Sequence, residues 1–341
     1  MFTLPAGAAG SRIVGLGHHQ PARVMTNDDV ARFVETNDEW IRSRTGIVTR
    51  HVAADDVTVA DMATAAAEHA LADAGVDPGD VDLVIVATTT AVDRSPNTAG
   101  RVAYALRTGV QPGASTPEGE EAPDLRDVVG PGVVDINTAC SGFAYAMGLA
   151  DQAIRTGSAR TAVVVGSEKL TAVTDWSDRS TSILTADGAG AAVLQATDEP
   201  AVSPVVWGSE PEITPAVVIE APTEKFAQDG RTVFKWAITR AADRARRVVE
   251  ASGLGLDEIE VLVAHQANLR IIEPLAKSLG LEDRVVVTDI TESGNTSAAS
   301  IPLGMSKWWH AGRLPADAPA LLFGFGGGFT WAGQVVLTPR R

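Results

Sequence analysis

The one cysteine of this chain stands where a nucleophile is expected. Cys140 follows the apolar run VVDINTA and opens the expected helix CSGFAYAMGLADQAI. At a helix N-terminus, the helix dipole and the free N–H groups favour the thiolate, which is the reactive form of cysteine. A lone buried cysteine is also often only a small apolar side chain. The placement between a strand end and a helix start favours the nucleophile.

His265, Asn295 and a run of three glycines could complete this chemistry. His265 ends the apolar run VLVA, so it is expected at the C-terminal end of a strand, where catalytic groups of α/β sheets commonly project. Asn295 lies in a Gly-Asn-Thr-Ser turn, and the three glycines follow Phe325. Taken singly, these features have ordinary explanations: a structural histidine, a common turn, and a backbone that approaches a neighbouring group closely. Together, a thiol, an imidazole, an amide and a loop of N–H donors suit work on an acyl thioester.

These side chains need a scaffold of alternating strands and helices. Almost continuously apolar runs predict strands buried on both faces: Asp82–Thr88, Val133–Thr138, Ala162–Gly166, Val261–Ala264, Val285–Val287 and Ala320–Phe323. Ala-rich segments between them predict helices over Thr58–Ala74, Ser141–Arg155 and Ala237–Ser252. Gly75 suits the end of the first helix. The alternation indicates an α/β fold.

The chain also repeats itself. Ala74–Ala87 aligns without gaps with Ser252–His265, and Asp187–Leu194 weakly echoes Gly328–Leu337. Two similar halves, 1–198 with Cys140 and 199–341 with His265 and Asn295, are the simplest interpretation. Chance similarity of helix–turn–strand units is the alternative. The stretch 111–132 is rich in Pro, Gly and acidic residues and predicts a surface insertion.

Bulk composition excludes several partners. The net charge of −15 repels nucleic acid and anionic membranes, so neither is expected to bind. One cysteine cannot form an internal disulfide, and the N-terminus lacks the pattern of a signal peptide. No run reaches the roughly 18 to 20 apolar residues of a membrane span. We therefore expect a cytoplasmic protein.

Short motifs between residues 37 and 331 carry a family resemblance. They are Asn37–Ile41 with Arg44–Ile47, Asn137–Phe143, Asp187–Ala191, Val233–Lys235, His265–Ile272, Gly294–Pro302 and Phe325–Trp331. In these motifs the chain resembles β-ketoacyl-acyl-carrier-protein synthase III, the initiating condensing enzyme of the thiolase superfamily. HQANLRI followed by GNTSAAS is the most specific part. The resemblance implies a five-layered αβαβα fold in two duplicated halves, usually as a homodimer.

The resemblance also implies a mechanism. Cys140 takes the acyl group of an acyl-CoA primer, and malonyl-acyl-carrier protein then replaces CoA. His265 and Asn295 stabilise the enolate formed by decarboxylation, which attacks the Cys140 thioester. The backbone N–H groups of Cys140 and Gly327 form the oxyanion hole. The product is a 3-oxoacyl-acyl-carrier protein that initiates fatty acid synthesis. No cofactor is implied, because acyl-CoA is a substrate, and no metal is implied.

Further residues gain roles from the same resemblance. Those implied to bind CoA are Trp40, Arg44, Arg179, Gly230 and Asn268. Those implied to bind the acidic carrier protein are Lys235, Arg270 and Lys277, although an ordinary solvated face would show the same cations. The stretch Thr88–Arg107 resembles the dimer-facing loop and helix of the family.

The acyl pocket is where this sequence departs from its relatives. Thr185 stands where a Phe commonly closes the pocket floor, and Ser95 where the partner subunit often inserts a bulky aromatic. Each buried methylene is worth about 0.8 kcal/mol, so the freed space predicts that branched or medium-length primers compete with acetyl-CoA. Neighbouring side chains could instead refill the space.

Three other functions fit parts of the same pattern. A synthase-III-like enzyme of a specialised pathway would prime a polyketide or transfer an acyl group to another acceptor. Such transferases often alter the Asn or the Cys, and both are intact here. A cysteine hydrolase also uses Cys, His and Asn, but the chain lacks a protease-type motif. A non-catalytic acyl-binding protein would have a degenerate site.

Overall fold

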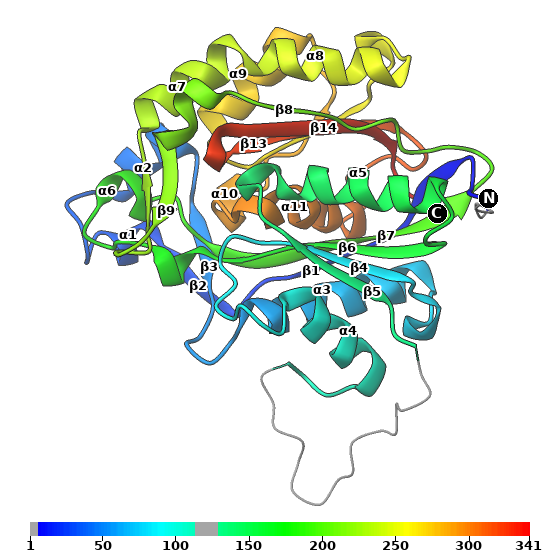
Figure 1. Cartoon of the computed structure of the whole chain (residues 1–341). Coiled ribbons are helices and arrows are strands. Elements are labelled where there is room, and N and C mark those ends of the chain that lie inside the picture. Colours follow the sequence, from blue (N-terminus) through cyan, green and yellow to red (C-terminus); the bar gives the residue numbers. More distant parts are fainter. Residues whose placement is uncertain (1–5, 113–128) are drawn as a thin grey trace, which may run out of the picture.

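The computed structural model describes residues 6–112 and 129–341, which form five stacked layers (Figure 1). Two sheets of five strands alternate with three layers of helices. The thiolase-like αβαβα architecture expected from the family resemblance is therefore confirmed. Most of the expected surface insertion at 111–132 lies outside the described residues.

The two sheets share one topology. Their strand orders are β1-β7-β6-β4-β5 and β8-β14-β13-β11-β12. In each order the first three strands are antiparallel neighbours and the last three are parallel. The first sheet consists of β1 (Gly10–His19), β7 (Asp187–Thr197), β6 (Thr161–Lys169), β4 (Leu83–Ala87) and β5 (Gly132–Ile136). The second consists of β8 (Val206–Ser209), β14 (Thr330–Leu337), β13 (Pro319–Gly326), β11 (Val261–Ala264) and β12 (Val285–Val286).

The internal repeat of the sequence has a structural counterpart. Helix α3 (Val59–Ala74) leads into β4, and α8 (Ala241–Ser252) leads into β11, at equivalent places in the two sheets. One sheet is built from residues 10–197 and the other from residues 206–337. The boundary between halves near residue 198 stays a prediction.

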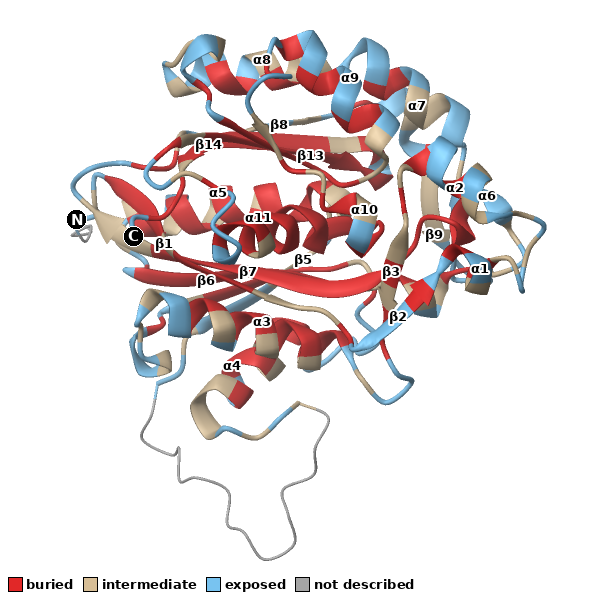
Figure 2. Cartoon of the chain, turned by 180° about the vertical axis from the view of Figure 1, so that it is seen from behind, coloured by how far each residue is buried: buried red, intermediate tan, exposed pale blue. Residues whose placement is uncertain are grey.

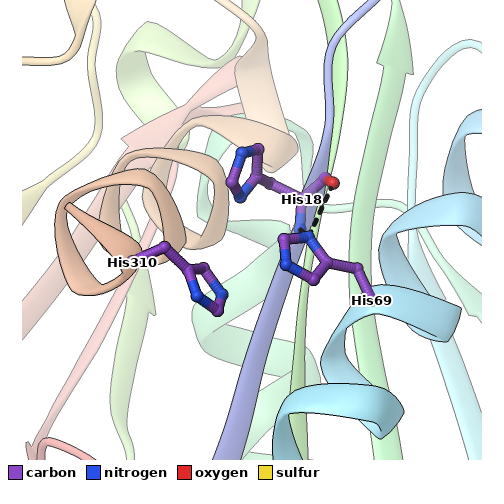
Figure 3. A group of neighbouring side chains, drawn as sticks. All are labelled: His18, His69 and His310. Carbon is purple, nitrogen blue, oxygen red and sulfur yellow. Dashed lines mark hydrogen bonds between the residues drawn. The ribbon is translucent and has the colours of Figure 1, made fainter.

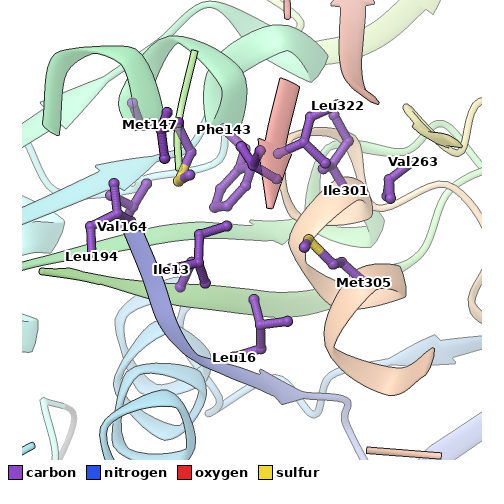
Figure 4. Close-up of a cluster of buried hydrophobic side chains, with 14 of the residues drawn as sticks. Ile13, Leu16, Phe143, Met147, Val164, Leu194, Val263, Ile301, Met305 and Leu322 are labelled. Carbon is purple, nitrogen blue, oxygen red and sulfur yellow. The ribbon is translucent and has the colours of Figure 1, made fainter. Parts of the chain in front are cut away.

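The central layer is the core of the molecule. Helix α5 (Gly142–Arg155) and helix α11 (Ser300–His310) lie between the sheets, and α5 contacts strands of both. Buried side chains from these helices meet those of the strands, as with Phe143, Met147, Ile301 and Met305 (Figure 4). Figure 2 shows this layer and the sheets buried, with exposure concentrated on the outer helices. The core therefore fixes the N-termini of α5 and α11.

The outer elements cover the sheets and one end of the molecule. Helices α3 and α4 (Thr98–Thr108) cover the first sheet, and α7 (Gly230–Thr239), α8 and α9 (Leu269–Leu279) cover the second. The end beside the site holds two antiparallel strand pairs and four short helices: β2 (Arg23–Thr26), β3 (Thr49–Val52), β9 (Val217–Glu220), β10 (Lys225–Gln228), α1 (Asn27–Val30), α2 (Asp38–Thr45), α6 (Arg179–Ser182) and α10 (Ile290–Ser293).

The helix predictions are confirmed except at one boundary. Thr58 caps α3 and forms a capping box with Asp61, and Gly75 ends the helix at φ +63°. The prediction of one helix over Ala237–Ser252 is wrong in its first turn. Arg240 has a φ of −123° and separates α7 from α8, so the residues before it belong to α7. None of the helices in the described ranges is long and apolar enough to cross a bilayer.

The expectation that every apolar run is buried on both faces is wrong for β5. The strand lies at the edge of the first sheet, and its Val133 and Val134 are 38% and 42% exposed. Periodicity reports apolar character and does not report which strand is at an edge. An apolar edge strand invites pairing with another chain.

Three histidines hold the C-terminal end of α11 against β1 and α3 (Figure 3). His18 Nδ1 contacts Ser306 Oγ at 2.9 Å, and His310 Nε2 contacts the Leu16 carbonyl at 2.8 Å. The rings of His69 and His310 stack at 4.5 Å with 20° between their planes. Burial, and then the neighbouring histidines, lowers the pKa of His18 to about 4. His18 is therefore neutral at neutral pH.

Candidate active site

Cys140 lies on a strained turn at the start of α5. A single 3₁₀ turn, Ala139–Ser141, joins the end of the β5 segment to the helix. Ala139 adopts a φ of +46°, which is unfavourable for a residue with a side chain and is typical of functional sites. A Cβ built on Gly326 would lie 2.8 Å from the Cys140 sulfur. The first glycine of the triple-glycine loop therefore makes room for the thiol.

His265 is placed at the end of β11, as predicted. The backbone N–H of His265 donates to the Phe323 carbonyl at 2.8 Å, and the residue is 2% exposed. Nδ1 lies 2.7 Å from Ser300 Oγ, which also accepts the backbone N–H of Gln266 at 3.2 Å. The arrangement that satisfies every group has the hydroxyl donating to Nδ1, with the ring proton on Nε2. Burial lowers the pKa of His265 to about 3, so the imidazole is neutral.

Asn295 is fixed by the loop that precedes α11. Its backbone N–H donates to the Leu184 carbonyl at 2.9 Å, and its backbone carbonyl accepts the N–H of Ala186 at 3.0 Å. The side-chain oxygen accepts the N–H of Ser297 at 2.8 Å. Because this bond occupies the oxygen, the NH₂ group is the end of the amide that can donate to a ligand.

Two adjoining cavities bring the three predicted catalytic residues together. Cys140 and Asn295 line both cavities, and His265 lines the second. The first has a volume of about 290 Å³, and its apolar wall includes Leu170, Val218 and Ile219. The second has a volume of about 350 Å³ and reaches from the thiol to Trp40, Arg44, Gly230, Asn268 and Arg270.

Four of the five residues expected to bind CoA line the second cavity, and the fifth, Arg179, lies over the ring of Trp40. Two cations lie over the Trp40 ring: the Arg179 guanidinium at 4.8 Å and that of Arg44 at 5.9 Å from its centroid. A purine can enter between Trp40 and Arg179 only if the two side chains separate. Asn268 caps α9, accepting the N–H of Arg270 at 2.9 Å and donating to the Arg44 carbonyl at 3.0 Å, so it also has a structural role.

The residues expected to dock the carrier protein occupy α7 and α9. Lys235 and Lys277 are exposed on these two helices. Arg270 lies at 5.5 Å over the Phe234 ring and also lines the second cavity. The three cations therefore extend from the cavity mouth along the outer helical layer, where a partner of opposite charge could bind.

The two positions expected to shape the acyl pocket lie outside both cavities. Thr185 is fully buried, and its hydroxyl pairs with that of Thr174 at 2.8 Å. Ser95 is exposed in the loop before α4. In the single chain, the apolar walls beside the thiol come instead from residues such as Leu170 and Phe226. The prediction that the site accepts primers longer than acetyl-CoA therefore depends on the space between these apolar walls.

Comparison with known proteins identifies the family. Two family models match the chain: 3-oxoacyl-[acyl-carrier-protein] synthase III over residues 134–211 and its C-terminal counterpart over residues 249–338. Beta-ketoacyl-[acyl-carrier-protein] synthase III 4 of Streptomyces coelicolor is 51% identical over 333 residues, covering 97% of this chain and 99% of the relative. The chain belongs to the 3-oxoacyl-[acyl-carrier-protein] synthase III family. It is accordingly an acyltransferase of the condensing class.

Solved structures superpose closely on this synthase III. The priming β-ketosynthase from the R1128 polyketide biosynthetic pathway has a TM-score of 0.89 and 36% identity, covering 99% of both chains. The 3-oxoacyl-[acyl-carrier-protein] synthase III of Aquifex aeolicus has a TM-score of 0.86 and 35% identity, covering 96% of this chain and all of that one. Over residues 6–112 and 129–341, the fold of the synthase is thus that of its family.

The protonation state of the thiol departs from the expectation. The helix N-terminus was expected to favour the thiolate, but burial raises the pKa of Cys140 to about 11. The Ser297 hydroxyl and the N–H groups of Cys140 and Gly327 lower this pKa, and the negative charge of Glu168 raises it. Burial outweighs the donors because packed protein stabilises an anion less well than water does. The resting synthase therefore holds a thiol that must lose its proton during catalysis.

Ser297 and Glu168 are functional candidates that the sequence analysis missed. Ser297 lies within GNTSAAS, but only Asn295 was singled out there. Glu168 ends the apolar run AVVVGS, and an acid inside a buried strand is the signal that could have drawn attention to it. Its side chain is fully buried, and its carboxylate accepts the hydroxyl of Thr90 at 2.6 Å.

Ser300 is the third missed residue, and its replacement gives a testable result. Ser300→Ala removes the hydroxyl that holds the proton of His265 on Nε2. We expect malonyl decarboxylation to fall about tenfold, the equivalent of one hydrogen bond of about 1.4 kcal/mol, while acylation of Cys140 is retained. Release of CO₂ and intact mass measure the two steps, and ¹⁵N NMR reports the tautomer.

Ser306→Ala is the matched control for this test. It is the same substitution on the same helix, and it removes a buried hydroxyl that contacts His18 instead of His265. Equal decarboxylation by Ser300→Ala and the wild type would contradict the positioning role of Ser300.

Proposed function

We propose that this synthase joins the acyl group of an acyl-CoA primer to malonyl-acyl-carrier protein, with loss of CO₂, and so initiates fatty acid synthesis. The observation that carries this proposal is the second cavity, which runs from Trp40 to Cys140 and is lined by His265 and Asn295. A cavity of this shape lets a long thioester arm bring its carbonyl to a thiol and to two hydrogen-bond donors at once. The names of the similar synthases support the same substrates.

The first half-reaction acylates the enzyme. The Cys140 sulfur attacks the acyl-CoA carbonyl, the carbon–sulfur bond to CoA breaks, and CoA leaves. Negative charge develops on the carbonyl oxygen during this step. Cys140 and Gly327 both line the first cavity, and their backbone N–H groups are the proposed oxyanion hole.

The second half-reaction forms the carbon–carbon bond. His265 Nε2–H and the Asn295 NH₂ group donate to the thioester carbonyl of malonyl-acyl-carrier protein. As CO₂ leaves, these two donors stabilise the enolate, whose carbon attacks the Cys140 thioester. A neutral imidazole suits this role, because its N–H donates a hydrogen bond but is far less acidic than an imidazolium, which would protonate the carbanion. The chemistry uses CoA as a substrate and needs no cofactor.

Substrate recognition follows from the outer residues. Trp40, Arg179 and Arg44 would bind the adenine and phosphates of CoA at the cavity mouth by stacking and charge. Lys235, Arg270 and Lys277 would bind the acidic carrier protein on the outer helical layer. A cytoplasmic site of action, expected from the composition, belongs to the same proposal.

A panel of acyl-CoAs assayed with malonyl-acyl-carrier protein tests the function. We expect a 3-oxoacyl-carrier protein two carbons longer than the primer, read by mass. Branched or medium-length primers should compete with acetyl-CoA. Free fatty acid as the only product would indicate a hydrolase and overturn the proposal.

The same panel examines a second candidate function. The structural similarity to the R1128 priming ketosynthase, at a TM-score of 0.89, favours the priming of a polyketide as the alternative. The discriminating comparison is between carrier proteins. Faster condensation on a polyketide carrier than on the fatty acid carrier would assign the synthase to the specialised pathway.

We expect a homodimer formed across the exposed edge strand β5. Pairing of two copies would cover the exposed Val133 and Val134 and satisfy the free backbone groups of the edge. Light scattering should give twice the 35.5 kDa of the chain. Val134→Glu should shift the mass toward the monomer, whereas Val24→Glu, at an exposed valine of β2, should not. A wild-type monomer would contradict this assembly.

A further inference from the structure

Three histidines that are far apart in the sequence form one group outside the active site. His18 lies near the end of β1, His69 lies in α3, and His310 is the last residue of α11. One ring nitrogen of each histidine lies within 4.8 Å of those of the other two (Figure 3). The three elements belong to three adjacent layers, so only the folded chain brings these rings together. None of the three histidines lines either cavity of the active site.

Each of the three rings also has a nitrogen in contact with an oxygen. Nδ1 of His18 lies 2.9 Å from Ser306 Oγ, and Nε2 of His310 lies 2.8 Å from the Leu16 carbonyl oxygen. Nδ1 of His69 lies 3.2 Å from the His18 carbonyl oxygen. A histidine that binds a metal ion almost always donates its other N–H to a carboxylate, a backbone carbonyl or water, which fixes its tautomer and the direction of its ring. The group therefore has the outer contacts that a metal site needs.

These contacts indicate which ring nitrogens can bind an ion. The Leu16 carbonyl can only accept, so the proton of neutral His310 is on Nε2 and the lone pair is on Nδ1. Nδ1 of His69 lies 3.2 Å from the His18 backbone nitrogen as well as from the His18 carbonyl oxygen, so this ring can adopt either tautomer. An ion on Nε2 of His69 selects the tautomer that donates to the carbonyl. The nitrogens left for the ion are then Nε2 of His18, Nε2 of His69 and Nδ1 of His310.

The charges around the group agree with the binding of a cation. Burial and the neighbouring histidines lower the pKa of His18 to about 4, and the neutral imidazole is the form that binds a metal. A carboxylate oxygen of Asp73 lies 3.9 Å from Nδ1 of His310. The ammonium of Lys307 also acts on His18, but it is paired with the Asp289 carboxylate at 2.7 Å, which balances its charge.

We propose that His18, His69 and His310 bind one divalent transition-metal ion, such as Zn²⁺, with water or Asp73 as a fourth ligand. Imidazole nitrogen suits zinc, copper and nickel, whereas magnesium and calcium prefer oxygen. Zinc binds imidazole at about 2.0–2.1 Å in a tetrahedral arrangement, which places two ligand nitrogens about 3.4 Å apart. The three nitrogens therefore have to approach one another by at most about 1.4 Å. The stacked rings of His69 and His310 tilt for this, and His310 is exposed, so its ring has room to move.

The bound ion would join three layers of the fold at the end of α11 opposite the active site. The helix begins at Ser300, whose hydroxyl contacts His265, and it ends at His310, about 15 Å further along the axis. The unfolded chain does not bring the three histidines together, so the ion binds the folded chain and stabilises it. The ion takes no part in the chemistry at Cys140, so the inference does not rest on the proposed function.

Titration of the full-length chain with ZnCl₂ tests the inference. The chain carries no affinity tag, and a chelator removes any metal before calorimetry. Cys140→Ala is the background protein, because a thiol in the same site as His265 is a second place where zinc could bind. We expect one zinc ion per chain. At a free zinc concentration a hundred times Kd, Tm should rise by about 4 °C, because the ion binds only the folded chain.

His310→Gln and His69→Gln, each made in the background protein, remove one ligand. Loss of an outer contact alone weakens a metal site about 10- to 100-fold, so loss of a ligand should weaken zinc binding more than about a hundredfold and abolish the rise in Tm. His51→Gln is the matched control, because a ring nitrogen of His51 also contacts a backbone carbonyl, that of Pro21 at 2.6 Å, but His51 lies outside the group. It should bind zinc as the background protein does.

Three results would overturn the inference. The first is a background protein that binds no stoichiometric zinc, and the second is zinc binding that His310→Gln leaves unchanged, which would place the ion elsewhere. The third comes from Co²⁺ and does not depend on the folding of any variant. Cobalt held by three imidazoles in a tetrahedral site absorbs visible light strongly, whereas cobalt on surface carboxylates is octahedral and absorbs weakly. Weak octahedral absorption alone would therefore reject the site. Each result leaves the acylation and condensation assays of the proposed function unaffected.

Discussion

Cys140→Ala should abolish acylation by acyl-CoA and leave measurable malonyl decarboxylation, whereas Asn295→Ala should acylate normally and lose decarboxylation. The two half-reactions use different groups of one site: the sulfur forms the acyl-enzyme, and the amide donates to the carbonyl on which the enolate develops. Removal of a nucleophile commonly costs about a millionfold in rate, and removal of one oxyanion donor about a hundredfold to a thousandfold.

Two assays on the same samples separate these effects. Intact mass after incubation with acyl-CoA reports acylation, and CO₂ released from malonyl-acyl-carrier protein reports decarboxylation. Asn295 also anchors Ser297 and the Leu184–Ala186 backbone, so Asn295→Asp serves as a second variant that keeps an accepting oxygen and removes the donor. Condensation by Asn295→Ala at near the wild-type rate would show the assignment to be wrong.

Gly326→Ala should reduce acylation about a hundredfold, although it adds one methyl group. The new Cβ would lie 2.7 Å from the Cβ of Cys140 and 2.8 Å from its sulfur, closer than carbon and sulfur atoms can approach. The Cys140 thiol cannot easily move away, because Cys140 is the second residue of a turn whose first residue, Ala139, is already strained at φ +46°. A displacement of about 1 Å at a reacting atom costs about a hundredfold in rate.

A second glycine provides the control. Gly130→Ala should acylate like the wild type, because a Cβ at Gly130 would meet no atom within 4 Å. Thermal unfolding distinguishes a misplaced thiol from a damaged fold, since overpacking by one methyl group typically costs about 1–3 kcal/mol of stability. Acylation of Gly326→Ala within a factor of two of the wild type would contradict the close packing of the triple-glycine loop on the nucleophile.

Much of the scaffold could be predicted because it depends on local sequence. The strand β4, the helix α3 with its Thr58 cap, and the strand end that carries His265 all follow from short patterns of apolar, capping and turn residues. These features arise from interactions between residues a few positions apart, so a single sequence contains them. The reactive residue types of the site could be identified from the sequence for the same reason, and the motifs around them indicated the family.

The sequence by itself determined which residue types could react and which regular elements carry them. The tertiary structure alone decided the exposed edge of β5, the raised pKa of the Cys140 thiol and the burial of Glu168 among three threonines. Each depends on contacts between segments far apart in the chain. Burial sets the free energy of ionising a thiol, and burial is a property of the packed molecule. A helix N-terminus visible in the sequence therefore predicted a thiolate, whereas burial in the folded chain raises the pKa of the Cys140 thiol.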